Sequence, residues 1–249
     1  MIAIKNDSQL VQMRRACKIA ANALAVGAAE IREGVTTAHI DAAIKKYILS
    51  QSAKPSFLGY NGFPASACIS VNDEIIHGIP GGRKLCQGDI VSIDVGAFFE
   101  GFHGDTAATF PVGECDPEDL RLLEVTKSAL SAGISAAKAG NRIGDISNAV
   151  QNVVEKAGFT VVRDYVGHGV GEKLHEDPEV PNFGNLGHGP RLVEGMTIAI
   201  EPMVNAGGWE IDILDNNWTV VTTDGKHSAH FEHTVLITAD GGKPLTTAD

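Results

Sequence analysis

The feature that most constrains this chain is a pair of β-rich runs on either side of Glu100-Gly101, each carrying one aspartate. A glycine between two such runs is typical of a hairpin with a short loop. A two-residue loop places Gly96 opposite Asp105, and Asp94 then lies one diagonal step from Asp105 on the same face of the sheet. Diagonal neighbours are about 7–8 Å apart, so the two carboxylates can converge on one centre. A three-residue loop would place them on opposite faces.

Aspartate is uncommon inside strands and is rarely buried without a partner. A cation between the two carboxylates is therefore one interpretation of the hairpin. The alternative is a hairpin whose aspartate face is simply exposed to water. The hairpin alone does not decide between them, and the choice depends on the rest of the chain.

The composition indicates an ordinary globular protein and argues against several classes of partner. The 249 residues are 43% hydrophobic, enough for one large domain or two small ones. A formal net charge of −11, with scattered Lys and Arg, argues against nucleic acid or a membrane surface as the main partner. No apolar run has the length of a signal peptide or a membrane span, which favours a cytoplasmic protein. The four cysteines lack CxxC spacing and are expected to be free thiols.

Helical periodicity predicts two pairs of helices. Asp7 or Ser8 is expected to cap the first helix, and the second helix is expected to begin at Thr36 or Thr37. Asp116, an N-cap followed by proline, begins a long third helix. A fourth helix is expected from about residue 143 to residue 158.

The two halves of the chain repeat each other weakly. The segment Leu85–Asp94 overlies Leu192–Glu201 with matching leucine, glycine and isoleucine positions, and its terminal carboxylate falls on that of the second segment. We therefore expect one α+β domain, with two pseudo-twofold-related α/β halves at about 1–112 and 113–240. Residues 241–249 are expected to form a frayed tail.

The last part of the chain is expected to form an antiparallel meander of four strands, at 197–201, 209–214, 218–223 and 228–238. Glu201 and Glu232 fall inside these strands, at positions that acids avoid. Together with the two aspartates, they make four strand-borne carboxylates. Such a set cannot share a buried centre as bare anions, because repulsion and desolvation would neutralise some of them, whereas divalent cations remove the conflict.

His168, which lies between two glycines, offers an imidazole to the same centre. A lone histidine in a glycine-rich turn is more often a structural residue, and only the four acids favour a ligand. Four carboxylates and one histidine suit two ions about 3.5–4 Å apart. Mn, Fe, Co and Zn all remain open.

The segment 54–64 carries three aromatic residues, Phe57, Tyr60 and Phe63, among two prolines and two glycines. Regular structure is therefore not expected there. The aromatic rings either pack onto their own domain or form the wall of a pocket.

Seven runs of the sequence, in order and spread over almost the whole chain, resemble the type I methionine aminopeptidases of the bacterial form, which have the pita-bread fold. These runs are Ser70–Pro80, Ile93–Gly96, Gly101–Thr106, Gly167–Gly171, His175–Pro178, Gly195–Met203 and Phe231–Thr234. The resemblance implies a central antiparallel sheet with helices on one side. It also implies removal of the N-terminal methionine from nascent or short peptides when the second residue is small.

The resemblance implies a role for individual residues as well. The implied metal ligands are Asp94, Asp105, His168, Glu201 and Glu232, with Asp94 and Asp105 on different ions and Asp105 and Glu232 bridging. The residues implied to line the methionine pocket are Phe57, Tyr60, Phe63, Cys68, Leu174 and Trp218. His77 and His175 are implied to line the substrate site. We expect Glu201 to act as the base, His175 to donate to the oxyanion and His77 to orient the peptide.

Two positions depart from the family. Leu174 stands where an aromatic residue is frequent, and His230 stands where the family often has glutamine. His230 is expected to be an ordinary surface histidine rather than an extra polar contact near the metals. The alternative functions are an X-Pro aminopeptidase or a non-catalytic binding protein of the same fold. We expect a monomer, with a transient ribosome contact left open.

Overall fold

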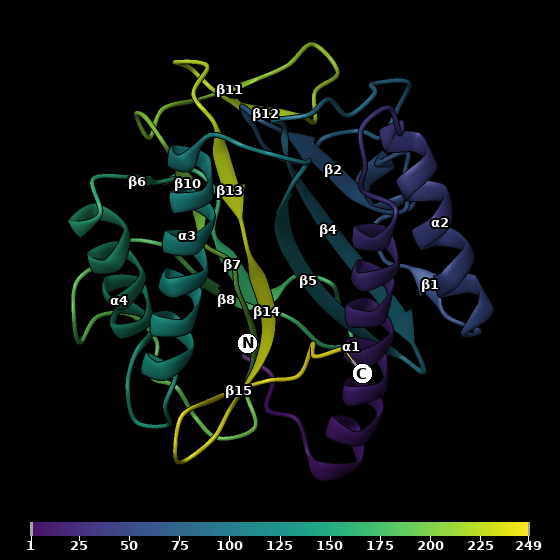
Figure 1. Ribbon diagram of the computed structural model, residues 1–249. Coiled ribbons are helices and arrows are strands. Elements are labelled where there is room, and N and C mark those ends of the chain that lie inside the picture. The colour runs from purple at the N-terminus through teal and green to yellow at the C-terminus, as the bar shows by residue number, and fades with distance from the viewer. Residues whose placement is uncertain (1, 249) are drawn as a thin grey trace.

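Four helices lie on one side of a central sheet in the computed structural model, which describes residues 2–248. Figure 1 shows α1 (Asp7–Ala29) and α2 (Thr37–Ser50) on one flank and α3 (Pro117–Ala136) and α4 (Ile143–Lys156) on the other. The predicted α+β class, with an antiparallel sheet and helices on one side, is confirmed. No helix within residues 2–248 is both long and apolar enough to cross a membrane.

The helix starts follow local capping chemistry. Thr36 and Asp116 cap α2 and α3, as predicted. The cap of α1 is Asn6, one residue before the predicted position, because its side chain accepts from the Gln9 backbone while the Gln9 side chain accepts from the Asn6 backbone. This reciprocal capping box satisfies two backbone donors at once. Helix α4 ends two residues before the predicted end.

Nine strands form the central sheet. They are β1 (Lys54–Pro55), β2 (Cys68–Val71), β4 (Ile90–Phe99), β5 (Phe102–Pro111), β7 (Gly167–Gly169), β8 (Glu176–Val180), β9 (Thr197–Ile200), β14 (Glu232–Ile237) and β15 (Gly242–Pro244). Their order is β1-β4-β5-β14-β9-β7-β8, with β2 pairing with β4 and β15 with β14. The pairs are antiparallel.

The hairpin has the predicted register. Gly96 pairs with Asp105, and Asp94 pairs with Ala107. Glu100 and Gly101 both have positive φ angles, of 49° and 91°. Two consecutive residues of this kind are the signature of a type I′ turn, whose twist matches that of the strands.

Two small sheets and a 3₁₀ turn complete the fold. The elements are β3 (Glu74–Ile76), η1 (Tyr60–Gly62), β6 (Thr160–Val161), β10 (Met203–Asn205), β11 (Ile211–Ile213), β12 (Val220–Thr222) and β13 (Ser228–His230). The sheets have the orders β13-β10-β6 and β11-β12-β3.

The predicted meander is wrong in its connectivity. Its strands are present but shorter, and they belong to three different sheets. The run 228–238 divides at Phe231, because β13 pairs with β10 whereas β14 pairs with β9 and β5.

The segment 242–248 also differs from the expected frayed tail. Residues 242–244 form β15, and Leu245 and Thr246 are buried, while residue 249 of the expected tail lies outside the described residues. Thr246 Oγ lies 2.9 Å from His233 Nδ1 and accepts a hydrogen bond from the Thr234 backbone.

The core lies between the helices and the sheet in two large clusters, one packed under each helix pair. Gly27 of α1 and Gly133 of α3 lie at the helix contacts. A Cβ on Gly27 would collide with Ile44 of α2, and one on Gly133 would collide with Val150 of α4. The exact division into halves at residue 112 stays a prediction.

Candidate metal centre

Five consecutive strands of the central sheet each bring one predicted donor to the same place. In sheet order these are Asp94 on β4, Asp105 on β5, Glu232 on β14, Glu201 directly after β9 and His168 on β7. We call these five residues the floor. All except His168 are acids: two come from the hairpin β4-β5, and the other two from the second half of the chain.

His168 is oriented by its neighbours. A Cβ on Gly167 would collide with the carbonyl of Ala199, and one on Gly169 with the carbonyl of Asp177, so the strands can close around the histidine only with glycine at both positions. The Nδ1–H of His168 donates to its neighbour's carbonyl at 2.8 Å. Its Nε2 is therefore a free acceptor.

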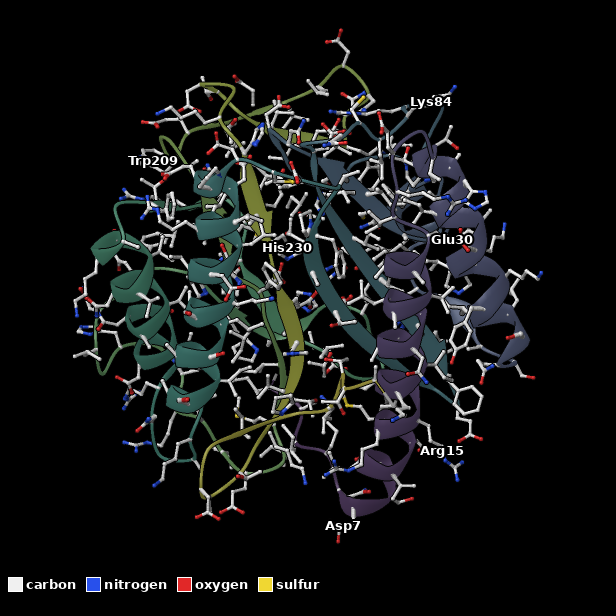
Figure 2. All side chains as sticks on the ribbon, viewed as in Figure 1. Asp7, Arg15, Glu30, Lys84, Trp209 and His230 are labelled. Carbon is white, nitrogen blue, oxygen red and sulfur yellow. The ribbon has the colours of Figure 1, made fainter. Side chains whose placement is uncertain are left out.

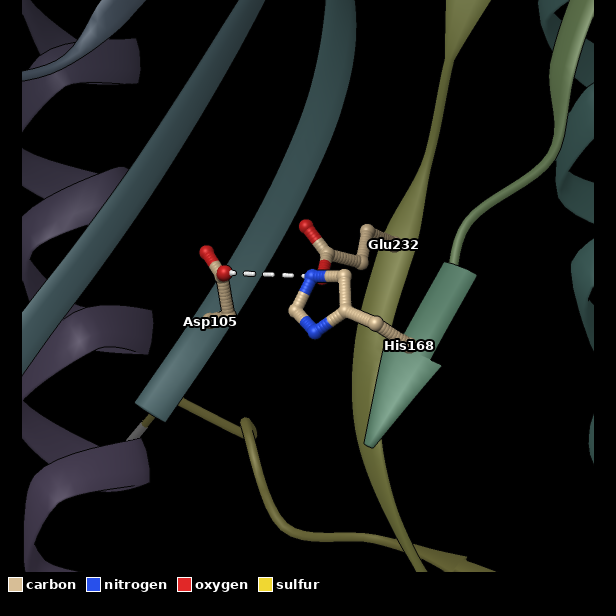
Figure 3. Close-up of side chains that lie close together, drawn as sticks. All are labelled: Asp105, His168 and Glu232. Carbon is tan, nitrogen blue, oxygen red and sulfur yellow. Dashed lines mark ion pairs between the residues drawn. The ribbon is translucent and has the colours of Figure 1, made fainter. Parts of the chain in front are cut away.

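The free nitrogen of His168 faces the carboxylates. Its Nε2 lies 3.8 Å from Asp105 Oδ2 and 3.5 Å from Glu201 Oε1. One ligand atom each from Asp105, His168 and Glu232 lie within 4.8 Å of one another. Figure 3 shows these three side chains pointing toward one another from three separate strands.

Several floor oxygens have no partner among the described residues. Asp94 Oδ1, Asp105 Oδ1 and Glu232 Oε1 are buried without a hydrogen bond. Leaving a buried polar group unsatisfied costs about 1–3 kcal/mol, and more for a charged group. An oxygen-rich set with one imidazole is a donor set that Mn, Fe, Co and Zn accept, so the residues fit divalent cations.

The protonation of the floor leads to the same conclusion. Burial, followed by repulsion from neighbouring carboxylates, raises the pKa values of Asp94, Asp105 and Glu232 well above the usual carboxyl range. Burial raises the pKa of Glu201 to about 8 and lowers that of His168 to about 3. Without cations, protons must neutralise these acids. Divalent ions would replace those protons.

An apolar wall stands beside the floor. It consists of six side chains of one hydrophobic cluster that line the cavity: Phe57, Tyr60, Phe63, Cys68, Leu174 and Trp218. Floor and wall together line one cavity of about 230 Å³. The aromatic residues of segment 54–64 therefore face a pocket, as in the interpretation that they form a pocket wall.

His77 and His175 also line this cavity. The His175 Nδ1 lies 2.7 Å from the Tyr60 hydroxyl, and its ring centroid lies 4.2 Å from that of His168. His77 has a left-handed φ of 58°, which is rare for a residue with a Cβ and is typical of functional sites. Burial lowers the pKa of His77 to about 4, with further contributions from His230 and His175, and burial also lowers that of His175. Both imidazoles are therefore neutral at pH 7.

His230 is not a surface residue, and that prediction was wrong. Its side chain lies in the middle of the molecule (Figure 2), and the residue is 2% exposed. Its Nε2 lies 3.5 Å from Glu201 Oε2 and has no hydrogen-bond partner among the described residues. Its backbone is held on both sides by the Thr109 hydroxyl, which accepts from His230 N–H and donates to its carbonyl. Because side chains alternate along a strand, His230 and Glu232 lie on the same face. The alternation does not show that this face is buried, since burial depends on which other strands pack against it.

Some residues of the site carry no sequence signal. Tyr165 and Ile76 line the cavity, and Tyr165 makes an edge contact with the His77 ring at 5.6 Å between centroids. Asp41 of α2 accepts hydrogen bonds from the backbone N–H groups of Ser66 and Ala67, at 2.8 and 2.9 Å. It thereby holds the segment that leads to Cys68, although in sequence it looks like an ordinary surface acid of a helix.

Comparisons with known proteins agree with this geometry. Residues 11–239 match the sequence profile of metallopeptidase family M24. The chain is 51% identical to a methionine aminopeptidase of Clostridium perfringens over 246 residues, which is 99% of each chain. It is equally similar, at 51% and with the same coverage, to methionine aminopeptidase 1 of Bacillus subtilis.

Solved structures give the same result. The fold is similar to that of a methionine aminopeptidase from Thermotoga maritima, with a TM-score of 0.97, 46% identity and coverage of 99% of this chain and 100% of the other. It is also similar to a prolidase from Pyrococcus furiosus, with a TM-score of 0.81 and 25% identity. In that case the match covers 99% of this chain but 66% of the prolidase.

Proposed function

The chain belongs to metallopeptidase family M24 and is a metal-dependent hydrolase with the activity of a methionine aminopeptidase, and from this premise we propose how its residues divide the work. The observation that carries the proposal is the convergence of five donors, with unpartnered buried oxygens, beside an apolar cavity. Neither alternative function has comparable support. The prolidase match covers only part of that longer protein, and all five donors are present here.

Two divalent ions would be held by the five floor residues. Asp105 and Glu232 would be shared between the ions, and Asp94 would serve one of them. His168 and Glu201 would serve the other. When bound, such ions lower the pKa of a water molecule and polarise the scissile carbonyl. The donor set leaves Mn, Fe, Co and Zn open.

Protons are moved by the chain's own side chains. Glu201 takes a proton from the attacking water and passes it to the leaving amine, because its buried carboxylate belongs to the floor and lies 3.5 Å from His168 Nε2. His175 donates to the developing oxyanion. If the Tyr60 hydroxyl donates to Nδ1 of His175, the proton of the neutral ring lies on Nε2, where it is available to the substrate.

Substrate choice depends on the wall. A thioether is unbranched and polarizable and makes favourable contacts with aromatic edges, at about 0.3–1.5 kcal/mol each. The methionine side chain would therefore enter the wall, with its free amine toward Asp94. His77 would orient the peptide beyond the scissile bond. The second residue would have to be small, because Tyr60 and His77 crowd the space next to it.

We also propose that the protein acts in the cytoplasm as a monomer, with at most a transient ribosome contact. Nascent chains with N-terminal methionine arise there, and the net charge of −11 disfavours stable binding to RNA. Light scattering on the purified protein, with and without ribosomes, measures its oligomeric state and its binding to ribosomes. A stable dimer or a stable ribosome complex would overturn this proposal.

The function is tested by removing metal with a chelator and adding back each divalent ion in turn. Cleavage of Met-Ala-Ser should disappear and then return with at least one of Mn, Fe, Co and Zn, while an Ala-Pro peptide stays uncut. Full activity in the chelated protein would overturn the metal proposal. Faster cleavage of the Ala-Pro peptide would favour the X-Pro alternative.

A further inference from the structure

A buried ion pair joins the first residues of the chain to the turn that carries His175. Lys5 Nζ lies 2.7 Å from Glu176 Oε2, and the two side chains are only 4% and 12% exposed. Lysine is almost never buried unless it is paired. Taking both charges out of water is costly, so such a pair is weak evidence for a purely stabilising role.

The fold makes room for this lysine. A Cβ on Gly171 would collide with the end of the Lys5 side chain, and one on Gly195 would press against Ile4 and the Lys5 carbonyl. The Lys5 backbone N–H donates to the Gly195 carbonyl at 2.9 Å. The N-terminal segment is thus seated over Gly195, and its ammonium crosses Gly171 to reach Glu176.

Glu176 uses its two oxygens for different purposes. Oε1 accepts from the Lys173 backbone N–H at 3.1 Å, which closes the turn 171–176, while Oε2 accepts from Lys5. Within the turn, Gly171 N–H donates to the Lys173 carbonyl at 3.0 Å. The turn is therefore held from inside by one oxygen and from the N-terminal segment by the other.

His175 is the residue immediately before Glu176 and has no backbone hydrogen bond of its own among those described for this turn. Its ring position over the floor depends on the turn and on the Tyr60 hydroxyl. A displacement of about 1 Å in a positioned group can cost about 10²-fold in rate.

We propose that Lys5 is a positioning residue for His175: its ammonium fixes the Glu176 carboxylate, which fixes the turn that aims the imidazole at the substrate. This inference rests on the proposed role of His175. Lys5 itself touches neither the cavity nor the floor.

The decisive experiment compares Lys5→Met in two backgrounds. In the wild-type protein, Lys5→Met should lower kcat for Met-Ala-Ser by about 10- to 100-fold, with KM changed less than about threefold and metal content unchanged. In a His175→Ala background it should change kcat less than about twofold, because the group that it positions is already gone. A merely structural role would lower kcat equally in both backgrounds.

Two further variants guard against a folding defect. Lys5→Met combined with Glu176→Gln leaves no unpaired buried charge and should show the same loss of kcat. Arg121→Met removes a surface pair with Glu118 on α3, together with contacts to Ala157 and Phe159, none of which belongs to the turn, and should leave kcat unchanged. Equal losses for Arg121→Met and Lys5→Met would overturn the proposal.

A measurement without metal or substrate completes the test. In the chelated protein, hydrogen exchange of the Lys173 amide should be at least about tenfold faster after Lys5→Met, while β2 amides exchange as before. Unchanged exchange together with unchanged kcat would overturn the role of Lys5. If His175→Ala itself leaves kcat unchanged, the proposed function of His175 fails instead, and the two failures are distinguishable.

Discussion

The floor of the cavity consists of ionisable side chains, whereas its wall consists mainly of apolar ones. The floor consists of strand-borne acids and one imidazole whose buried oxygens lack partners. The wall consists of aromatic, aliphatic and sulfur-bearing side chains that pack against one another, as Phe63 does edge-on against Trp218 at 5.1 Å between centroids. The wall is complete without a ligand, whereas the floor needs cations.

This difference separates two kinds of defect. Changes in the floor should alter metal content and therefore every property that depends on metal. Changes in the wall should alter substrate affinity and leave metal content unchanged. His77 and His175 line the same cavity but belong to neither region, so their variants show whether each one affects metal content or substrate affinity.

Asp105→Asn should have the largest effect, because Asp105 is buried and close to both His168 and Glu232. We expect kcat/KM at limiting metal to fall by about 10³-fold or more, since a bound ion supplies several kcal/mol of transition-state stabilisation. Metal analysis after dialysis, alongside the peptide assay, measures this. Full metal content with full activity in this variant would show that Asp105 is not a metal ligand.

His175→Ala should lower kcat by about 10²–10³-fold while metal content stays unchanged, because the side chain donates to the oxyanion and holds no ion. His168→Ala is the matched comparison. In that variant metal affinity should fall first. Loss of metal from the His175 variant would mean that a ligand has been taken for a donor.

Trp218→Leu tests the wall. It should lower kcat/KM for Met-Ala-Ser by about 10- to 200-fold with metal content unchanged, since lost contacts in an apolar pocket are worth about 1–3 kcal/mol. Norleucine should be cleaved nearly as well as methionine by the unaltered protein. Faster release of leucine or lysine than of methionine would show that the wall has been assigned to the wrong substrate.

His230 gives a smaller effect at the border of the floor. His230→Ala should weaken metal binding by about 10-fold, because residues that orient a ligand typically contribute about 10–100-fold to metal affinity. His230→Gln, which keeps a polar side chain, should stay within about threefold of the unaltered protein. Metal titration measures the affinity of both variants. Equal losses of affinity would show that a polar side chain at position 230 does not orient Glu201.

The smallest effect concerns the stability of the chelated protein. Burial raises the folded-state pKa of Glu201 to about 8, so its favourable contribution is present at low pH and is lost as pH rises toward 8. Histidines with lowered pKa values, such as His168, act in the opposite direction, but only below about pH 6.5. The melting temperature should therefore fall between pH 6.5 and pH 8, and saturating cobalt should abolish the fall. A flat profile in the chelated protein would contradict the description of the floor.

Much of the local structure could be predicted from neighbouring residues. The turn at Glu100-Gly101 set the hairpin register, and with it the common face of Asp94 and Asp105. The capping residues Thr36 and Asp116 marked helix starts. These features depend on φ preferences, caps and the period-two alternation of strands, which act over a few residues.

The positions of distant partners could not be predicted in this way. His230 looked like a surface residue because its burial depends on β13 lying against β5, whose Thr109 hydroxyl bonds the His230 backbone on both sides. Asp41 looked like an ordinary helical acid, yet it holds the segment before Cys68. The run 228–238 looked continuous, because a change of pairing partner leaves no mark on alternation.

The sequence by itself thus determined the four helices, the hairpin with the two aspartates on one face and, through the resemblance of seven runs, the family. Only the tertiary structure decided that five donors come from five consecutive strands or their ends, that Lys5 reaches the turn that carries His175, and that His230 is buried beside Glu201. The reason is physical: local preferences act between neighbours in the chain, whereas burial and ion pairing depend on which distant segments the strand order brings together.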